Sequence, residues 1–172
     1  MATPKLPPPD SFHLDAALGW LGLSAPDEAL ADLDRIAPEH QSAAVALALR
    51  FAALSRLRRH ADAREVAEGH TRRHPKDSQG WINLANVLFW LDDAQAAHDC
   101  AAAQVDAFPD EWSLPYNLAC YSVKLDRIED ARRWLGEAVR RGRREVVHAA
   151  ALRDADLAPL HAELRAAPAD AR

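Results

Sequence analysis

The chain has 172 residues, of which 49% are hydrophobic, so it is long and apolar enough to bury the core of one domain. Its formal charge of −5 argues against a nucleic-acid-binding protein. The longest uncharged stretch, residues 78–91, is shorter than the roughly 18 residues that a membrane-spanning helix needs. The first residues lack the apolar segment of a secretory signal, and the two cysteines are too few for a disulfide scaffold. We therefore expect a cytoplasmic protein without membrane association.

Helices are predicted along most of the chain, because apolar residues recur at helical spacing and glycine is scarce. Residues 1–10 contain Pro4, Pro7, Pro8 and Pro9 and are predicted to form a flexible, Pro-rich tail. Whether the last helix is broken is left open at this stage. The predicted helices span residues 11–22, 27–36, 41–57, 60–73, 78–91, 94–107, 112–125, 128–141 and 145–166.

A period of 34 residues runs through these helices. Within one unit, Trp81, Leu84 and Leu88 follow one face of a helix, a polar break follows, and a second helical stripe ends at Pro109, which cannot continue a helix. Each unit is therefore predicted to be a helix A, a tight turn and a helix B, and stacked units bury a continuous core. The residues that keep this period are Leu23, Leu57, Leu91 and Leu125, and Ala29, Ala63, Ala97 and Ala131.

The pattern of Trp81, Leu84, Ala85, Ala97 and Pro109 resembles the tetratricopeptide repeat (TPR), over about residues 11–144. The resemblance implies an all-α fold: a right-handed superhelical solenoid of four antiparallel helix pairs with a C-terminal capping helix. It also implies a concave face, lined by the A helices, that binds peptides or partner helices. Segments 115–121 and 154–160 resemble small free-standing bacterial members of the family, which usually carry no assigned activity. The expected units are residues 11–40, 41–76, 77–110 and 111–144, followed by a cap helix and tail over residues 145–172.

The sequence departs from the family's pattern at two places. In the second unit, Arg50 and Phe51 stand where a leucine and a small residue are usual. Late in helix B, a small residue is present as Ala138, but larger residues replace it in the earlier units. We therefore expect irregular packing around the second and third units. The larger residues are Ile36, His70 and Gln104.

The C-terminal segment is expected to cap the solenoid, because a terminal unit must cover the last apolar face. Gly142 follows the last helix B at a plausible C′ position. The apolar residues available to the cap are Val146, Val147, Ala150, Leu152, Leu157, Leu160 and Leu164.

We find no motif for catalysis, phosphate binding or cofactor binding, so we expect no enzyme and no cofactor. His70 and His74 are four residues apart, as zinc ligands on one helix face can be. The intervening Arg72 and Arg73 repel a cation, so no metal site is expected. Two free cysteines remain, and we predict that both are small buried residues, with their redox state left open; they are Cys100 and Cys120.

Basic clusters are expected to be solvated helix ends. Positive charge late in a helix offsets the helix dipole, and the chain as a whole is acidic, so we expect no nucleic-acid partner. The cluster at 140–144 is the densest, and there nucleic-acid binding stays open as an alternative. The clusters lie at residues 56–59, 72–73, 132–133 and 140–144.

The remaining candidate site is the face of the A helices opposite the core. An exposed Trp90 would give contact area at low entropic cost, and asparagine side chains can hydrogen-bond an extended backbone. Alternatively, Trp90 belongs to the core, and Asn83 and Asn117 only bridge helices. The predicted groove residues are Arg56, Asn83, Asn86, Trp90, Tyr116, Asn117 and Lys124.

The three asparagines of this set resemble part of the clamp with which chaperone-adaptor members of the family grip a partner's C-terminal carboxylate. They are Asn83, Asn86 and Asn117. Ala48, Ile82 and Ser113 lie where charged residues of that clamp are expected, and none of them is basic. Binding of a carboxylate tail is therefore doubtful.

The sequence favours a non-enzymatic scaffold that binds a peptide or helix of an unknown cytoplasmic protein in the concave groove. One alternative is a secretion-type chaperone for an unfolded client, against which the four units and the Pro-rich start argue. Another is a self-assembling structural unit, so self-association stays open. Light scattering at several concentrations would separate the last alternative from the others.

Overall fold

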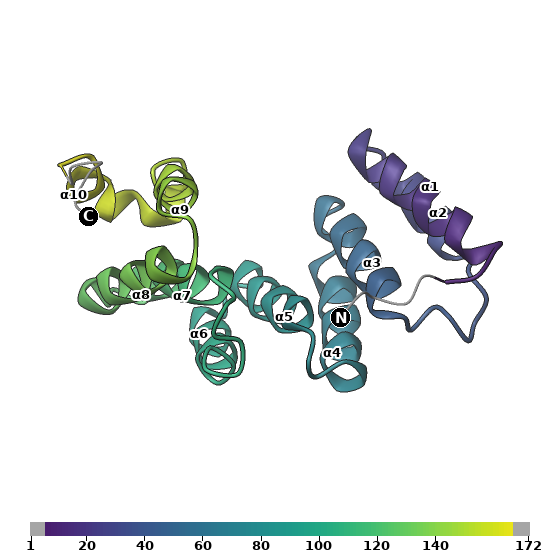
Figure 1. Ribbon diagram of the computed structural model, residues 1–172, viewed down its shortest axis with the longest axis horizontal. Helices are drawn as coiled ribbons and strands as arrows, with labels where there is room; N and C mark the ends of the chain where they lie inside the picture. The colour runs from purple at the N-terminus through teal and green to yellow at the C-terminus, as the bar shows by residue number, and fades with distance from the viewer. Residues whose placement is uncertain (1–5, 167–172) are drawn as a thin grey trace. The chain divides into compact units, whose positions relative to one another are not determined.

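The structure is a computed structural model that describes residues 6–166, and it divides into two compact units, Met1–Leu91 and Asp92–Arg172 (Figure 1). Within each unit, successive helices pack against each other, so the prediction of an all-α repeat fold is confirmed. The parts of the predicted tail and cap at residues 1–5 and 167–172 lie outside the described residues.

In the first unit, each helix packs against the next, and α3 also contacts α1 and α5. The helices are α1 (Asp10–Gly22), α2 (Pro26–Leu33), α3 (Ala44–Arg56), α4 (His60–Arg73) and α5 (Ser78–Trp90).

In the second unit, α6 packs on α7, α7 on α8, and the C-terminal elements return to cover α7 and α8. The predicted last helix is broken into three pieces, with Pro159 inside the 3-10 segment. The elements are α6 (Ala94–Ala102), α7 (Ser113–Lys124), α8 (Ile128–Arg141), α9 (Arg144–Ala151), the 3-10 helix η1 (Ala155–Leu160) and α10 (His161–Ala166).

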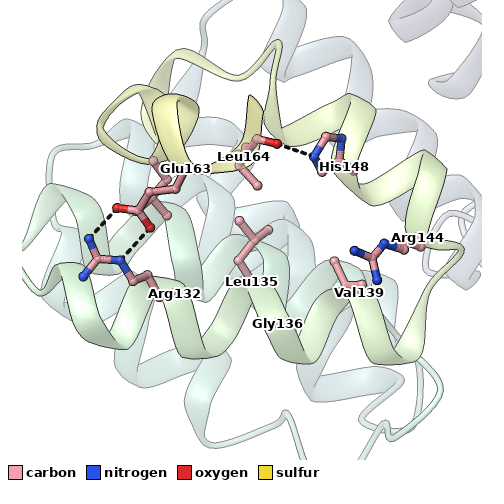
Figure 2. Close-up of a pocket in the computed structure, with 9 residues that line it drawn as sticks. Arg132, Leu135, Gly136, Val139, Arg144, His148, Glu163 and Leu164 are labelled. Atoms are coloured by element: carbon pink, nitrogen blue, oxygen red, sulfur yellow. Dashed lines mark hydrogen bonds and ion pairs between the residues drawn. The ribbon is translucent and has the colours of Figure 1, made fainter. Parts of the chain in front are cut away.

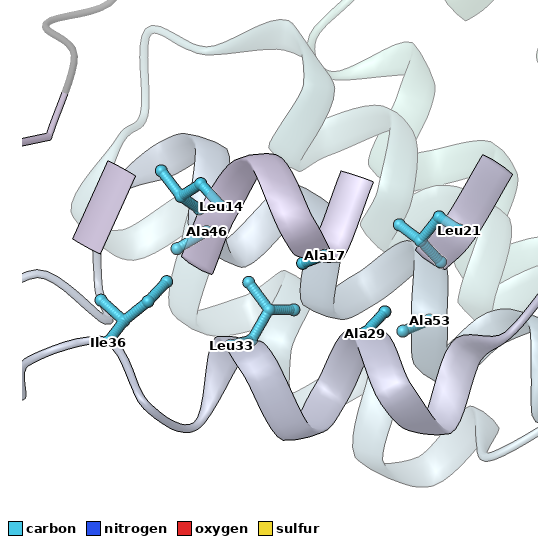
Figure 3. Packing of buried hydrophobic residues seen from close by; sticks show 8 residues of the cluster. All are labelled: Leu14, Ala17, Leu21, Ala29, Leu33, Ile36, Ala46 and Ala53. Carbon is cyan, nitrogen blue, oxygen red and sulfur yellow. The ribbon is translucent and has the colours of Figure 1, made fainter. Parts of the chain in front are cut away.

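Small residues let the helices of the first unit approach closely. Ala17, Ala29 and Ala53, from α1, α2 and α3, are fully buried in one cluster with Leu33 and Ile36 (Figure 3). Leucine and isoleucine side chains fill the space between the helices, whereas alanine lies where the helices approach most closely. The same repeat position is fully buried in every unit, as Ala29, Ala63, Ala97 and Ala131.

Each turn between a helix A and its helix B contains one residue in the left-handed conformation. These residues are Ser24, Arg58, Asp92 and Asp126, with φ of 59°, 57°, 65° and 59°. After α3, the N–H of Arg59 donates to the carbonyl of Leu54 at 2.9 Å, which is the long bond of a Schellman motif. The 34-residue period of the sequence is thus repeated in the backbone, although none of the four residues is a glycine.

Replacing Arg58 by glycine is expected to raise the free energy of unfolding by up to about 1 kcal/mol, because a left-handed residue with a Cβ atom costs more than the added chain entropy of glycine. Urea unfolding followed by circular dichroism measures the change. Arg58→Ala keeps the Cβ atom and removes the charge, so it serves as the control. An equal gain in Arg58→Ala would attribute the effect to charge and contradict the backbone explanation.

The first helix begins at Asp10, inside the range predicted as a tail. Its buried carboxylate accepts hydrogen bonds from the backbone N–H of Ala37 at 3.1 Å and from Nδ1 of His40 at 2.6 Å. The bond from His40 holds the pKa of Asp10 below its usual value. Leu6 also packs against the core, so the ordered chain extends further towards the N-terminus than the prolines suggested.

Helices α2 and α6 end earlier than predicted, at Leu33 and Ala102. Backbone hydrogen bonds then span three residues instead of four: the N–H of Ile36 donates to Leu33 at 3.4 Å, and that of Gln104 donates to Ala101 at 3.1 Å. Ile36 and Gln104 are two of the positions at which a larger residue replaces a small one. We attribute the early ends to this bulk, since α8, which carries Ala138 there, runs over the predicted residues 128–141.

The third such position, His70, is accommodated without shortening its helix. Its ring is fully buried, and its Nε2 atom lies 2.9 Å from Oδ2 of Asp77. The facing residue of α5 is Gly80, at which a Cβ atom would lie 3.1 Å from Cγ of His70. The histidine therefore fits because the neighbouring helix has no side chain at the point of contact.

Gly142 ends α8, but not in the left-handed conformation expected of a C′ glycine: its φ and ψ are −100° and 180°. Gly142 follows the helix as predicted, and the reason for a glycine here is space. A Cβ atom there would lie 2.8 Å from Cγ2 of Val147 and 3.0 Å from Cγ of Trp112. The close approach of α9 and of the start of α7 excludes a side chain.

Candidate functional site

The seven predicted groove residues are divided between the two units, and each group is described within its own unit. Trp90 is the last residue of α5, and its side chain is 44% exposed. The indole stacks on the buried ring of Phe51, with centroids 6.0 Å apart and planes at 22°, and the ring of His60 lies 5.5 Å away. Phe51 replaces the small residue that is usual at its position. The larger ring at this departure from the family's pattern is therefore what packs against the indole of Trp90.

A polar pocket of about 270 Å³ lies beside this tryptophan. It is lined by Ser55, Arg58, His60 and Trp90, which come from the end of α3, the following turn, the start of α4 and the end of α5. Arg58 is the left-handed residue of its turn. The pocket thus combines one aromatic face with a guanidinium group and an imidazole ring, which suits a planar or acidic group of a ligand.

The other groove residues of the first unit are less accessible. Asn83 is buried, and its Oδ1 atom accepts a hydrogen bond from Nε2 of Gln79 at 2.8 Å. Asn86 is half-buried. Arg56, the last residue of α3, is exposed and donates from a guanidinium nitrogen to the carbonyl of Leu21 near the end of α1. Its charge therefore offsets the dipole of a neighbouring helix.

In the second unit, the C-terminal segment covers part of the predicted groove. Tyr116 on α7 is buried, and its hydroxyl donates to Oδ2 of Asp154 at 2.8 Å. The thiol of Cys120, one turn further along α7, lies 3.7 Å from the same oxygen. Burial, and then the hydrogen bond to Asp154, raises the pKa of Tyr116.

Asp154 also holds the start of η1, because its Oδ1 atom accepts the backbone N–H of Asp156 at 3.0 Å. The sequence reasoning did not assign this residue. The segment 154–160 was noted only as part of the resemblance, and its aspartate followed by an apolar run is the signal that could have identified an N-cap. A cap does not reveal which helix the same side chain contacts, since Tyr116 precedes it by 38 residues.

The remaining groove residues of the second unit lie on α7. Nζ of Lys124 is 3.2 Å from Oδ1 of Asp92, the left-handed residue before α6, and both side chains are exposed. Asn117 is half-buried. An exposed ion pair of this kind contributes little to stability, so it leaves the lysine available to an acidic ligand.

A second pocket, of about 350 Å³, lies between α8 and the C-terminal elements (Figure 2). Leu135 and Val139 from α8 face Leu164 from α10 across it, and the ion pair of Arg132 with Glu163 lies at its edge (Figure 2). Nε2 of His148 lies 2.9 Å from the carbonyl oxygen of Leu164 and holds α10 against α9. The cap predicted from sequence therefore leaves a largely apolar opening.

Burial of the predicted cap residues varies. Val147, Leu157 and Leu160 are buried, whereas Val146 is 49% exposed. The thiols predicted to be buried differ too: Cys120 is buried and Cys100 is partly so. Burial raises the pKa of Cys100 to about 11, so this thiol stays protonated and weakly nucleophilic at neutral pH.

Among residues 6–166, no group of three or more histidine, cysteine or acidic side chains is arranged to hold a metal ion. Over the same residues, no helix has the length and apolar character needed to cross a membrane.

No protein-family model and no curated protein matches the sequence. Solved structures do match. MamA from Desulfovibrio magneticus RS-1 is 19% identical over 91% of this chain and 91% of that one, with a TM-score of 0.69. A thermophilic TPR protein from Thermus thermophilus is 17% identical over 91% and 95%, also with a TM-score of 0.69. YrrB, described as a TPR protein with an unusual peptide-binding site, is 14% identical over 88% and 82%, with a TM-score of 0.61.

These matches confirm the TPR fold that the 34-residue period indicated. The low identities show the fold alone. The fold by itself does not determine a function.

Proposed function

We propose that the chain is a non-enzymatic scaffold that binds a peptide or helix of a cytoplasmic partner protein, with Trp90 as its principal anchor. The observation that carries this proposal is the half-exposed indole, supported on Phe51 and bordered by the polar pocket. Tryptophan and arginine are enriched among residues that dominate binding energy. A fixed indole loses little freedom when a ligand covers it.

The chemistry of the pocket defines the preferred ligand. An apolar or aromatic side chain of the peptide would cover Trp90, and a neighbouring acidic side chain would approach Arg58 and His60. Within the second unit, Lys124 is suited to an acidic group of a ligand and Asn117 to a peptide backbone. Tyr116 supports the fold in this proposal, because its hydroxyl already donates a hydrogen bond to Asp154. The peptide-binding site named for YrrB is a precedent within the same fold.

The division into four repeats at residues 11–40, 41–76, 77–110 and 111–144 belongs to the same proposal. The left-handed residue at the same place in all four turns supports it. Each repeat would then contribute one A helix to the ligand-binding face of its own unit.

The proposal predicts that Trp90→Ala weakens binding of library-selected peptides at least tenfold, since loss of a central tryptophan contact costs about 2 kcal/mol or more. Peptides would be selected on the wild-type chain from a displayed random library and titrated by calorimetry. Val146→Ala, which changes another half-exposed apolar residue on α9, is the control and should bind as the wild type does. Equal affinities for Trp90→Ala and the wild type would contradict the assignment of Trp90.

Arg58→Gly separates binding from stability in the same assay. It is expected to stabilise the turn, yet to weaken selectively those selected peptides that carry an acidic residue. Unchanged affinity for acidic peptides would remove the pocket from the proposal.

A further inference from the structure

The second pocket, between α8 and the C-terminal elements, has an apolar middle and charged side chains at both ends (Figure 2). Leu135 on α8 faces Leu164 on α10 across it. The ion pair of Arg132 with Glu163 lies at one end, and Arg144, the first residue of α9, lies at the other. A partner helix would need an open apolar groove several turns long. A pocket bounded in this way suits a small molecule instead.

The size of this pocket also fits a small ligand. Its volume of about 350 Å³ lies in the range of small-molecule sites. At roughly 30 Å³ for each water-sized group, it holds on the order of ten non-hydrogen atoms. Gly136 lines its α8 wall, and a Cβ atom there would meet no other atom within 4 Å. The helix therefore offers space at this point, which a larger residue would fill.

Most polar groups around the pocket already have partners within the chain. Nε of Arg132 donates to Oε2 of Glu163 at 2.8 Å, and Nη2 of the same arginine donates to Oε1. Arg132 also pairs with Glu129, so two carboxylates share this one guanidinium. Nε2 of His148 lies 2.9 Å from the carbonyl oxygen of Leu164. The end of the pocket at Arg132 is therefore unfavourable for an anionic ligand.

The opposite end is positively charged. Arg144 is half-buried and belongs to the basic cluster at residues 140–144, four of which are arginines. In that cluster, Arg140 and Arg141 share the single carboxylate of Glu137. A guanidinium has five N–H donors, so Arg144 can bind a carboxylate in addition to the contact it already makes. The charge of this end therefore selects an anionic group of a ligand.

We propose that this pocket binds a small amphipathic carboxylate, with its apolar chain between Leu135, Val139 and Leu164 and its carboxylate at Arg144. Covering the chain removes apolar surface from water, and the paired hydrogen bonds of the guanidinium fix the direction in which the ligand lies. The site belongs to the second unit and does not involve Trp90. It is therefore independent of the proposed peptide site, and either can fail alone.

Octanoate is the probe, because it combines a carboxylate with an apolar chain of suitable length. Titration of the full chain at neutral pH, followed by NMR of backbone amides, is expected to show saturable shifts around the pocket. Octanol and octylamine should bind at least tenfold more weakly, since neither can accept the paired hydrogen bonds of a guanidinium. N-acetylleucine represents the C-terminal residue of a peptide, and tighter binding of it than of octanoate would overturn the assignment to a small molecule.

Two variants test where the ligand lies. Gly136→Leu fills the open space and is expected to weaken octanoate binding at least tenfold. Its matched control is Gly19→Leu, the same change at a glycine of α1 that also has no atom within 4 Å of its Cβ position. Arg144→Gln should weaken octanoate binding at least tenfold and leave octanol binding unchanged. Arg143→Gln, at the neighbouring exposed arginine outside the pocket, should bind octanoate as the wild type does.

Circular dichroism checks that all four variants fold. The proposal is overturned if octanoate shows no saturable binding, or if octanol binds as tightly as octanoate. It is also overturned if Gly136→Leu binds octanoate as tightly as Gly19→Leu, or if Arg144→Gln and Arg143→Gln bind it equally well.

Discussion

Replacing Gly80 by valine is expected to lower the free energy of unfolding by about 2 kcal/mol, because overpacking a filled core costs roughly 1–3 kcal/mol. Even a Cβ atom would lie 3.1 Å from Cγ and 3.2 Å from Cδ2 of His70, and that ring is fully buried and held by Asp77. The histidine therefore cannot move away without losing its hydrogen bond. Urea unfolding at constant pH measures the difference.

A double-mutant cycle isolates the cause of this loss. If His70 is the obstacle, Gly80→Val should cost much less in a His70→Ala chain than in the wild type. Gly136→Val on α8 is the matched control, since nothing lies within 4 Å of the position of its Cβ atom. A penalty that is the same with and without His70 would show that the contact between α4 and α5 is not what excludes a side chain.

Replacing Asp154 by alanine is expected to cost about 2 kcal/mol or more, since a buried hydroxyl loses its acceptor and η1 loses its N-cap. Tyr116 and Cys120 both lie within reach of the carboxylate, and neither is exposed enough for water to replace it readily. We expect η1 to detach from α7. The Cys120 thiol should then react faster with a thiol reagent, and urea unfolding should begin at lower concentration.

Asp156→Ala is the control for this experiment. Asp156 is exposed, and partial desolvation and the nearby charge of Asp154 raise its pKa, so removal of its carboxylate should cost little. If both alanine variants lose the same stability, the effect belongs to the acidic segment in general. If Asp154→Ala leaves the reactivity of Cys120 unchanged, the aspartate does not hold the segment in place.

The C-terminal segment bears directly on the proposed function. Because η1 packs on α7 and Asp154 holds Tyr116, part of the face predicted to bind a ligand is covered by the chain itself. The accessible aromatic surface of the proposed site is Trp90, at the end of α5. The proposal therefore places the principal contact in the first unit.

The sequence alone determined the parts of this protein that depend on neighbouring residues. The 34-residue period, the alternation of two helices with a tight turn, and the bounds of α4 and α8 follow from apolar spacing and from residues that stop a helix. These features depend on bonds that span about five residues, so they can be read from a short window. The fold class followed because stacked pairs of such helices bury their apolar faces in only a few ways.

Only the tertiary structure decided which of these side chains meet. His70 departs from the repeat, and its fit depends on Gly80 in the next helix. The ring of Trp90 stacks on Phe51, and the C-terminal segment that carries Asp154 buries Tyr116. Both contacts join residues that are far apart in the chain. The exposure of Phe12 and Leu23 likewise reflects what does or does not pack against α1. A periodic pattern assigns a residue to a face of a helix, but burial depends on whether another element covers that face.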